Sequence, residues 1–171
     1  QAGHEDCVTE LPGEPILYGA TYSVYTRIAR LALEEKGVAY ALRETDIFDP
    51  ATLDPAYRDI HPFDRIPALD HDGFLIYETG AIARYIDEAF PGAPLQPREL
   101  HARARMNQIV SIVDAYGYPF LTAKRVVERL FAAGEGRAPD EAVAKAGAET
   151  GRRCLAAIAA LADAPFLLGT N

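Results

Sequence analysis

Two positions in the sequence could hold an anionic or polar ligand, because each follows a predicted strand and begins a predicted helix. Ser23 precedes an amphipathic run that ends near Gly37, and Glu78-Thr79 precede a second run that ends near Phe90. A helix N-terminus offers free backbone N–H groups and the positive end of the helix dipole, so it favours an anion. Glu78 could also receive the ammonium group of a ligand. Ordinary helix capping explains the same residue types, so both interpretations stay open.

Pro67 lies between these two positions, in the stretch HPFDRIPALDHDGFLIYETG that covers residues 61–80. A proline cannot donate a ladder hydrogen bond, but it is tolerated at the mouth of an edge strand. The dipeptide taken alone favours a trans proline that simply opens the strand. Arg65 stands two residues before it and could bind a carboxylate or remain solvated.

The elements that must position these residues form a strand–helix–strand unit followed by a hairpin and a helix. Capping by Ser23 and a C-terminal Gly37 bound the first helix. A short apolar run, a segment with apolar residues at helical spacing and a segment with alternating apolar residues follow one another. This order predicts a parallel βαβ unit. Asp72-Gly73 supply the hairpin turn. The expected strands are 16–18, 38–45, 67–69 and 74–77, the expected helices are 23–36 and 79–90, and 46–62 is irregular or weakly helical.

The stretch PGAPLQP, residues 91–97, is the best linker in the chain, and the sequence after it is helical. We expect one helix over 98–131 with a kink at Pro119, and another after the GEGRAP break. That second helix should bury the face formed by Val143, Ala146, Thr150, Cys154, Ile158 and Leu161. The predicted organisation is a polar leader (1–14), an α/β domain (15–90), a linker (91–97) and a helical domain (98–171).

Composition narrows the classes of partner. The 171 residues include 17 Lys and Arg against 25 Asp and Glu, which gives a net charge of −8 and argues against binding of nucleic acid or of an anionic membrane surface. No apolar run could span a bilayer, and the start of the chain lacks the pattern of a secretory signal. Cys7 and Cys154 form no CxxC pair, and the histidines lack ligand spacing, so we expect free thiols, no metal site and a cytoplasmic protein.

Four stretches, in order, resemble the glutathione transferase superfamily. They are ILYGATYSVYTRIARLALEEKG, HPFDRIPAL, YETGAIARYI and the closing PFLLGTN. The resemblance covers residues 16–171 and is closest to serine-type, bacterial-like members. It implies an α/β thioredoxin-like N-terminal domain (βαβ–ββα) followed by an all-α helical domain. Relatives continue beyond PFLLGTN with a buried helix, so the resemblance implies that the helical domain is incomplete here.

The resemblance assigns a glutathione-binding role to five residues. Pro67 matches the cis-proline of the family, which leaves the backbone of Ile66 to bond the tripeptide as an added strand would. Glu78 and Thr79 would hold the γ-glutamyl end, and Arg65 would reach the glycyl carboxylate. Two departures stand nearby: His61 replaces the usual Asn, and Asp64 replaces the usual Gly and places a negative charge near an anionic ligand.

The catalytic residue in this resemblance is the one that meets the glutathione sulfur. Ser23 matches the serine of the serine-type classes, since it combines a hydroxyl donor with a helix N-terminus. Tyr18 is the alternative, because the tyrosine-type classes use the end of this strand, although its side chain could simply pack. Tyr22 and Tyr25 are weaker candidates. The absence of a cysteine from this loop argues against thiol-disulfide chemistry.

The resemblance therefore implies an enzyme, a glutathione S-transferase of the detoxification type that conjugates glutathione, its co-substrate, to a small hydrophobic electrophile. A second-substrate pocket would involve Met106, Val110, Val113 and Tyr116, although core packing explains these residues as well. Homodimers are expected on the same ground. The alternative is a glutathione-transferase-like binding or scaffold protein without catalysis.

Overall fold

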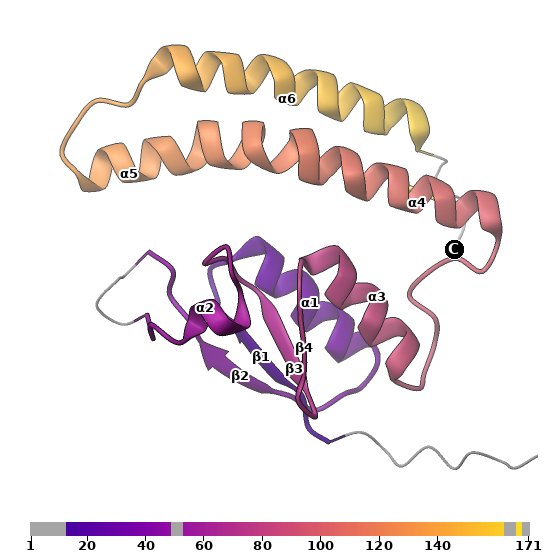
Figure 1. The fold of residues 1–171 in the computed structure, drawn as a ribbon. Helices are drawn as coiled ribbons and strands as arrows, with labels where there is room; N and C mark the ends of the chain where they lie inside the picture. The colour runs from indigo at the N-terminus through magenta and orange to yellow at the C-terminus, as the bar shows by residue number, and fades with distance from the viewer. Residues whose placement is uncertain (1–12, 49–52, 163–166, 169–171) are drawn as a thin grey trace, which may run out of the picture. The chain divides into compact units, whose positions relative to one another are not determined.

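The computed structural model describes residues 13–48, 53–162 and 167–168 (Figure 1). The chain divides into two compact units, with the boundary between Leu95 and Gln96. Most of the predicted leader, with Cys7, and most of the closing PFLLGTN stretch lie outside the described residues.

The first unit is built on a four-stranded sheet, and its topology confirms the predicted thioredoxin-like βαβ–ββα order. The strand order is β2-β1-β3-β4. Strand β1 pairs with β2 in parallel and with β3 antiparallel, and β3 and β4 form the predicted hairpin. The strands are β1 (Ile16–Gly19), β2 (Ala41–Glu44), β3 (Ala68–His71) and β4 (Phe74–Tyr77).

Helices cover both faces of this sheet. Helices α1 (Val24–Glu35) and α3 (Thr79–Ala89) lie together on one face (Figure 1), over a core that contains Leu17, Leu33, Leu69, Ile82 and Ile86. The short helix α2 (Tyr57–Ile60) belongs to a second cluster with Tyr18, Ile66 and Ala68. Because successive side chains of a strand point to opposite faces, Leu17 enters the first core and Tyr18 the second.

Local chemistry explains the boundaries that the sequence predicted. The Ser23 side chain caps α1, and Gly37 follows the helix with a φ of 67°. Asp72 and Gly73 take φ values of 53° and 83°, as a tight hairpin turn requires. Strand β2 is shorter than expected, since residues 38–40 do not join the sheet.

The second unit consists of helices. A continuous helical segment comprises α4 (Leu100–Ile112), η1 (Val113–Val127) and α5 (Glu128–Gly134), and α6 (Glu141–Leu161) packs against its η1 part. The stretch η1 is π-helical and contains Pro119. The wider π-helical turns accommodate a residue that cannot donate a backbone hydrogen bond, so the structure has this stretch in place of the single kink that we predicted.

The buried face of α6 differs from the predicted one. Cys154 is buried as expected, but Val143 and Ala146 are exposed. The buried residues are small: Ala144, Gly147, Ala148, Gly151 and Cys154. A Cβ atom at Gly147 would lie 2.7 Å from the carbonyl oxygen of Phe120, so α6 approaches η1 closely. We predicted that the larger apolar residues of α6 would be buried. The close contact with η1 instead leaves room only for small side chains.

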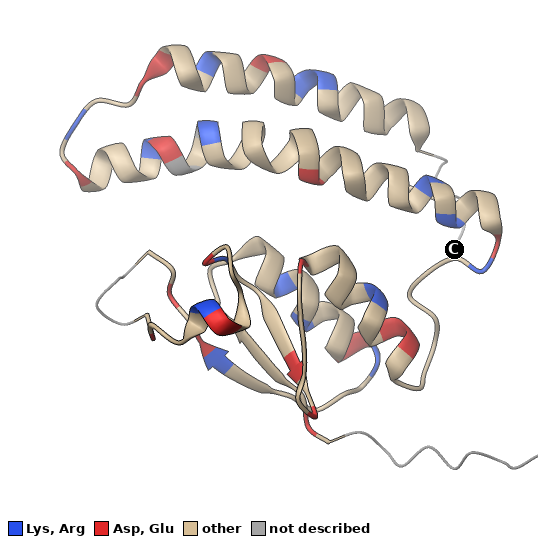
Figure 2. Cartoon of the chain, viewed as in Figure 1, with Lys and Arg blue, Asp and Glu red and all other residues tan. Residues whose placement is uncertain are grey.

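Charges of both signs are interspersed along the elements of both units (Figure 2). In the part of the chain that the structure describes, no helix is long and apolar enough to cross a membrane. The same residues include no group of three or more His, Cys, Asp or Glu that could hold a metal ion.

Candidate active site

Strand register brings the candidate residues of the first unit to one end of the sheet. Tyr18 of β1 pairs with Ala68 of β3, and Ala68 pairs with Tyr77 of β4. The end of β1, the start of β3 and the end of β4 therefore lie side by side. The segments that continue from these three points carry Ser23, the Ile66-Pro67 pair and the Glu78-Thr79 pair, which are far apart in sequence.

Ser23 lies at the N-terminus of α1 with its hydroxyl proton uncommitted. Its Oγ accepts a hydrogen bond from the backbone N–H of Thr26 at 3.3 Å. Among the described residues the Ser23 hydroxyl has no acceptor for its own proton, so it can donate to a ligand while it caps the helix. The side chain is half-buried.

The three tyrosines near this loop have other surroundings. The Tyr18 side chain is buried against Tyr57, with ring centroids 6.1 Å apart, and the Arg43 guanidinium lies over its ring. Tyr22 donates its hydroxyl proton to Asp46 at 2.7 Å, and this hydrogen bond lowers the pKa of the Asp46 carboxyl. Tyr25 is half-buried on α1 and has an interaction partner of its own.

The Ile66-Pro67 peptide bond is cis. The side chain of Ile66 is buried in the second core cluster with Tyr57 and Ala68. Among the described residues, no backbone hydrogen bond involves the N–H or the C=O of Ile66. Both groups are thus available to an extended ligand segment.

Glu78 and Thr79 form the start of α3 in an unusual conformation. Glu78 has a φ of 71° and occupies the cap position, and Thr79 is the first helical residue, not the cap. The Glu78 carbonyl accepts from the N–H groups of Ala81 and Ile82. The N–H groups of Thr79 and Gly80 have no backbone partner among the described residues, so an anion could bind them.

Arg65 is exposed, and Asp64 beside it is already paired. The Asp64 carboxylate accepts hydrogen bonds from Arg58, and the shortest contact joins Arg58 Nη2 and Asp64 Oδ2 at 2.8 Å. The negative charge that we expected to disfavour an anionic ligand is therefore balanced by a guanidinium. Arg58 was not among the predicted residues, because it lies in the stretch that showed no clear periodicity.

The His61 side chain is buried, and its ring contacts the rings of Tyr57 and Tyr77. Its Nδ1 accepts a hydrogen bond from the backbone N–H of Phe63 at 3.4 Å. Burial lowers the pKa of His61 below its ordinary value of 6.5, while the nearby Glu78 carboxylate opposes this effect. Glu78 and Arg65 both act on His61 electrostatically, so this ring lies within reach of the two charges that flank the site.

The first unit is similar to a domain of known proteins. Residues 17–94 match a family model described as glutathione S-transferase, N-terminal domain. The matched residues include Ser23, Ile66, Pro67, Glu78 and Thr79, and the match ends within the predicted linker.

Individual relatives agree with this domain match. A glutathione S-transferase from Triticum aestivum is 38% identical over 100 residues, which are 58% of this chain and 45% of the relative. Probable maleylacetoacetate isomerase 2 from Drosophila melanogaster is 31% identical over 102 residues, again 58% of this chain and 45% of the relative. The chain thus aligns with less than half the length of these curated relatives.

A solved structure extends the similarity into the helical unit. Glutathione transferase F7 from Populus trichocarpa has a TM-score of 0.74 and 27% identity, over 86% of this chain and 70% of the other. Together these matches support the glutathione S-transferase superfamily. The predicted pocket residues Met106 and Val110 lie half-buried on α4, and Val113 and Tyr116 lie exposed on η1. Their role stays a prediction.

Proposed function

We propose that this chain binds glutathione in its first unit and acts as a glutathione transferase. One observation carries the proposal: three sets of groups that have no partner among the described residues gather at one end of the sheet. They are the Ser23 hydroxyl proton, the Ile66 backbone and the N–H groups of Thr79 and Gly80. They do so within the part of the chain that matches the glutathione S-transferase domain.

The proposed binding mode uses each group for the part of the tripeptide that it suits. The N–H groups of Thr79 and Gly80 would receive the γ-glutamyl carboxylate, and Glu78 would pair with the ammonium group. The Ile66 N–H and C=O would bond the cysteinyl backbone. Arg65 would pair with the glycyl carboxylate. With these contacts, the sulfur would lie toward Ser23.

The chemistry follows from stabilisation of the thiolate. A free thiol has a pKa of about 8.5 and is mostly protonated at pH 7. Lowering the pKa of the glutathione thiol to about 6.5 requires about 3 kcal/mol of preferential thiolate stabilisation. Ser23 would donate its hydroxyl proton to the sulfur, and the N-terminus of α1 would add the field of its dipole. The thiol proton leaves to water. The thiolate then forms a carbon–sulfur bond with the electrophile: in a substitution the bond to the leaving group breaks, with halide released from an aryl halide, and in an addition the product takes up a proton from water.

Ser23 is preferred to Tyr18 as the residue that meets the sulfur. Tyr18 is buried in the cluster around α2. The Ser23 hydroxyl proton has no acceptor among the described residues, so Ser23 can donate it to a ligand. We further propose a small hydrophobic electrophile as second substrate, a homodimer as the working form and a cytoplasmic role in detoxification. The family resemblance supports these points, and the size of the particle in solution tests the dimer.

The function is tested by two measurements on the full chain. Calorimetric titration with glutathione measures binding, and conjugation of glutathione to an aryl halide measures turnover. Binding with turnover is the expected result. Binding without turnover would favour the scaffold alternative, and absence of binding would contradict the proposal as a whole.

A further inference from the structure

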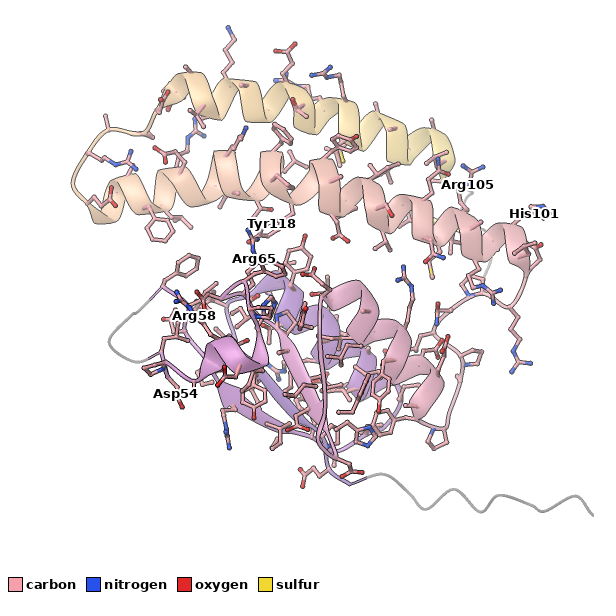
Figure 3. The ribbon with its side chains drawn as sticks, viewed as in Figure 1. Asp54, Arg58, Arg65, His101, Arg105 and Tyr118 are labelled. Carbon is pink, nitrogen blue, oxygen red and sulfur yellow. The ribbon has the colours of Figure 1, made fainter. Side chains whose placement is uncertain are left out.

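We propose that Arg58 and Asp64 are positioning residues that hold the loop 61–66 in the conformation needed for glutathione binding. The inference rests on the proposed function, since it concerns how the Ile66 backbone and Arg65 are presented to that ligand. Figure 3 labels Arg58 and Arg65, which come from α2 and from the loop that follows it.

The contact between Arg58 and Asp64 is bidentate, because two nitrogen atoms of the guanidinium contact the carboxylate. Arg58 Nε donates to Asp64 Oδ1 at 3.1 Å and to Oδ2 at 2.9 Å, and Nη2 lies 2.8 Å from Oδ2. Paired hydrogen bonds of this kind fix the orientation of a planar guanidinium against a carboxylate. The hydrogen bond to Asp64 also raises the pKa of Arg58.

The backbone of Asp64 explains why this pair is useful. Asp64 has a φ of 50°, in the left-handed region that glycine adopts most readily. The resembling segment of the family carries glycine at this position. An aspartate tolerates the left-handed region better than most residues, and its ion pair with Arg58 adds a tie that glycine cannot make.

Two further contacts from α2 and its end hold the loop on either side of Asp64. The Tyr57 hydroxyl donates to the carbonyl oxygen of Arg65 at 2.8 Å, and His61 Nδ1 accepts from the N–H of Phe63. The Asp64 N–H also donates to the His61 carbonyl at 3.0 Å. The loop is therefore fixed before, at and after Asp64, and the next residues are Arg65 and Ile66.

The Arg58–Asp64 pair should act on ligand affinity more than on global stability. The Arg58 side chain is 75% exposed and that of Asp64 is 33% exposed. Exposed ion pairs contribute little to folding, and salt screens them. Loss of the pair should therefore loosen the loop at Asp64, while the hydrogen bonds at Phe63 and Arg65, the sheet and the helices stay formed.

The test compares four single variants and the Arg58→Gln/Asp64→Ala double variant with the wild-type chain. Arg58→Gln and Asp64→Ala remove the pair, and Asp64→Gly removes it but restores backbone freedom. Arg152→Gln removes one exposed arginine from α6 as a control for net charge. Glutathione affinity is measured by calorimetry, and amide hydrogen exchange is followed in residues 61–66.

We expect Arg58→Gln and Asp64→Ala to weaken glutathione binding about fivefold and to speed exchange in the loop. Combining the two changes should weaken binding no further than Asp64→Ala alone, because Arg58→Gln removes a contact that Asp64→Ala has already removed. Asp64→Gly should retain more affinity than Asp64→Ala. Arg152→Gln should match the wild type, and melting temperatures should differ little.

Two results would overturn the inference. One is wild-type affinity in Arg58→Gln, and the other is unchanged exchange in residues 61–66 of that variant. Failure of the wild-type chain to bind glutathione would instead contradict the proposed function. The exchange rates do not depend on the ligand, so they separate the two failures.

Discussion

The ammonium group of Lys36 lies 3.0 Å from Oδ1 of Asp87, and both side chains are almost fully buried, at 2% and 6% exposure. Lys36 ends α1, and Asp87 belongs to α3. Lys36 Nζ also donates to the Ala93 carbonyl at 3.1 Å, and the Leu95 N–H donates to Asp87 at 2.8 Å. One ion pair therefore joins two helices of the first unit and the segment that leaves it.

Removal of either partner should destabilise the first unit strongly. Lys36→Met leaves a buried carboxylate without its cation, which costs roughly 3 kcal/mol. Chemical denaturation followed by circular dichroism measures the loss. Glu34→Gln provides the control, because the Glu34 side chain is exposed on α1 in its pair with the half-buried Arg30, so its loss should cost less than about 0.5 kcal/mol. Equal losses in the two variants would contradict this prediction.

Ser23→Ala should lower the conjugation rate roughly 100-fold near neutral pH, since the thiolate loses a hydrogen-bond donor. The defect should shrink as the pH approaches about 8.5, where the thiol ionises without help. Loss of the cap on α1 should also cost about 1 kcal/mol of stability. Rates measured across this pH range, with glutathione saturating, check the prediction.

Two controls accompany the serine variant. Ser23→Thr keeps a hydroxyl and a helix cap, so it should retain much of the activity. Tyr18→Phe keeps the packing of the ring and should change the rate little. A wild-type rate in Ser23→Ala together with a large loss in Tyr18→Phe would move the catalytic role to Tyr18.

Gly19→Ala should displace the start of α1, because a Cβ atom there would meet the side chain of Thr26, with Cγ2 at 2.7 Å. We expect a loss of about 2 kcal/mol from this overpacking. The double variant Gly19→Ala/Thr26→Ala should recover part of the loss, since it removes the atoms that clash. Gly134→Ala is the matched control, because a Cβ at Gly134 meets nothing within 4 Å. Absence of recovery in the double variant would refute the steric explanation.

His61 should make the first unit less stable in mild acid. Burial lowers the pKa of His61 in the folded chain below its ordinary value of 6.5, so the unfolded chain binds the proton more readily. Stability should therefore fall as the pH drops through the ordinary pKa of about 6.5, and level off once the folded state is also protonated. Denaturation of the wild type at several pH values measures the slope.

The substitution His61→Asn removes the titrating group and keeps an oxygen that can accept from the Phe63 N–H. It should flatten the dependence of stability on pH. His101→Gln is the control, since the His101 side chain is 93% exposed in the second unit and should leave the slope as it is. A slope that survives His61→Asn would assign the acid sensitivity to another group.

Short-range chemistry accounts for the part of the fold that the sequence predicted well. The Ser23 cap, the left-handed Gly37 and the Asp72-Gly73 turn are each decided by one or two neighbouring residues. Apolar periodicity placed α1 and α3 to within a residue or two of their observed ends. Because strand register then follows from the hairpin and the parallel pair, the grouping of Ser23 with Pro67 and Glu78 was also predictable.

Features that depend on a particular packing partner were not predictable in this way. Gly147 and Gly151 are required at their positions only because Phe120 and Leu121 lie so close to them that a larger side chain would clash. The Arg58–Asp64 pair joins a four-residue helix to a loop, and neither has a periodic pattern. The burial of His61 among aromatic rings likewise depends on where Tyr77 lies after the sheet has formed.

The left-handed backbone of Asp64 has a consequence for how this segment can vary in evolution. A glycine codon becomes an aspartate codon by a single base change, but the new side chain is favoured here only where a cation can meet it. We therefore expect residues 58 and 64 to change together among natural variants. Homologues with glycine at the second position should carry almost any residue at the first, whereas those with aspartate should retain arginine or lysine.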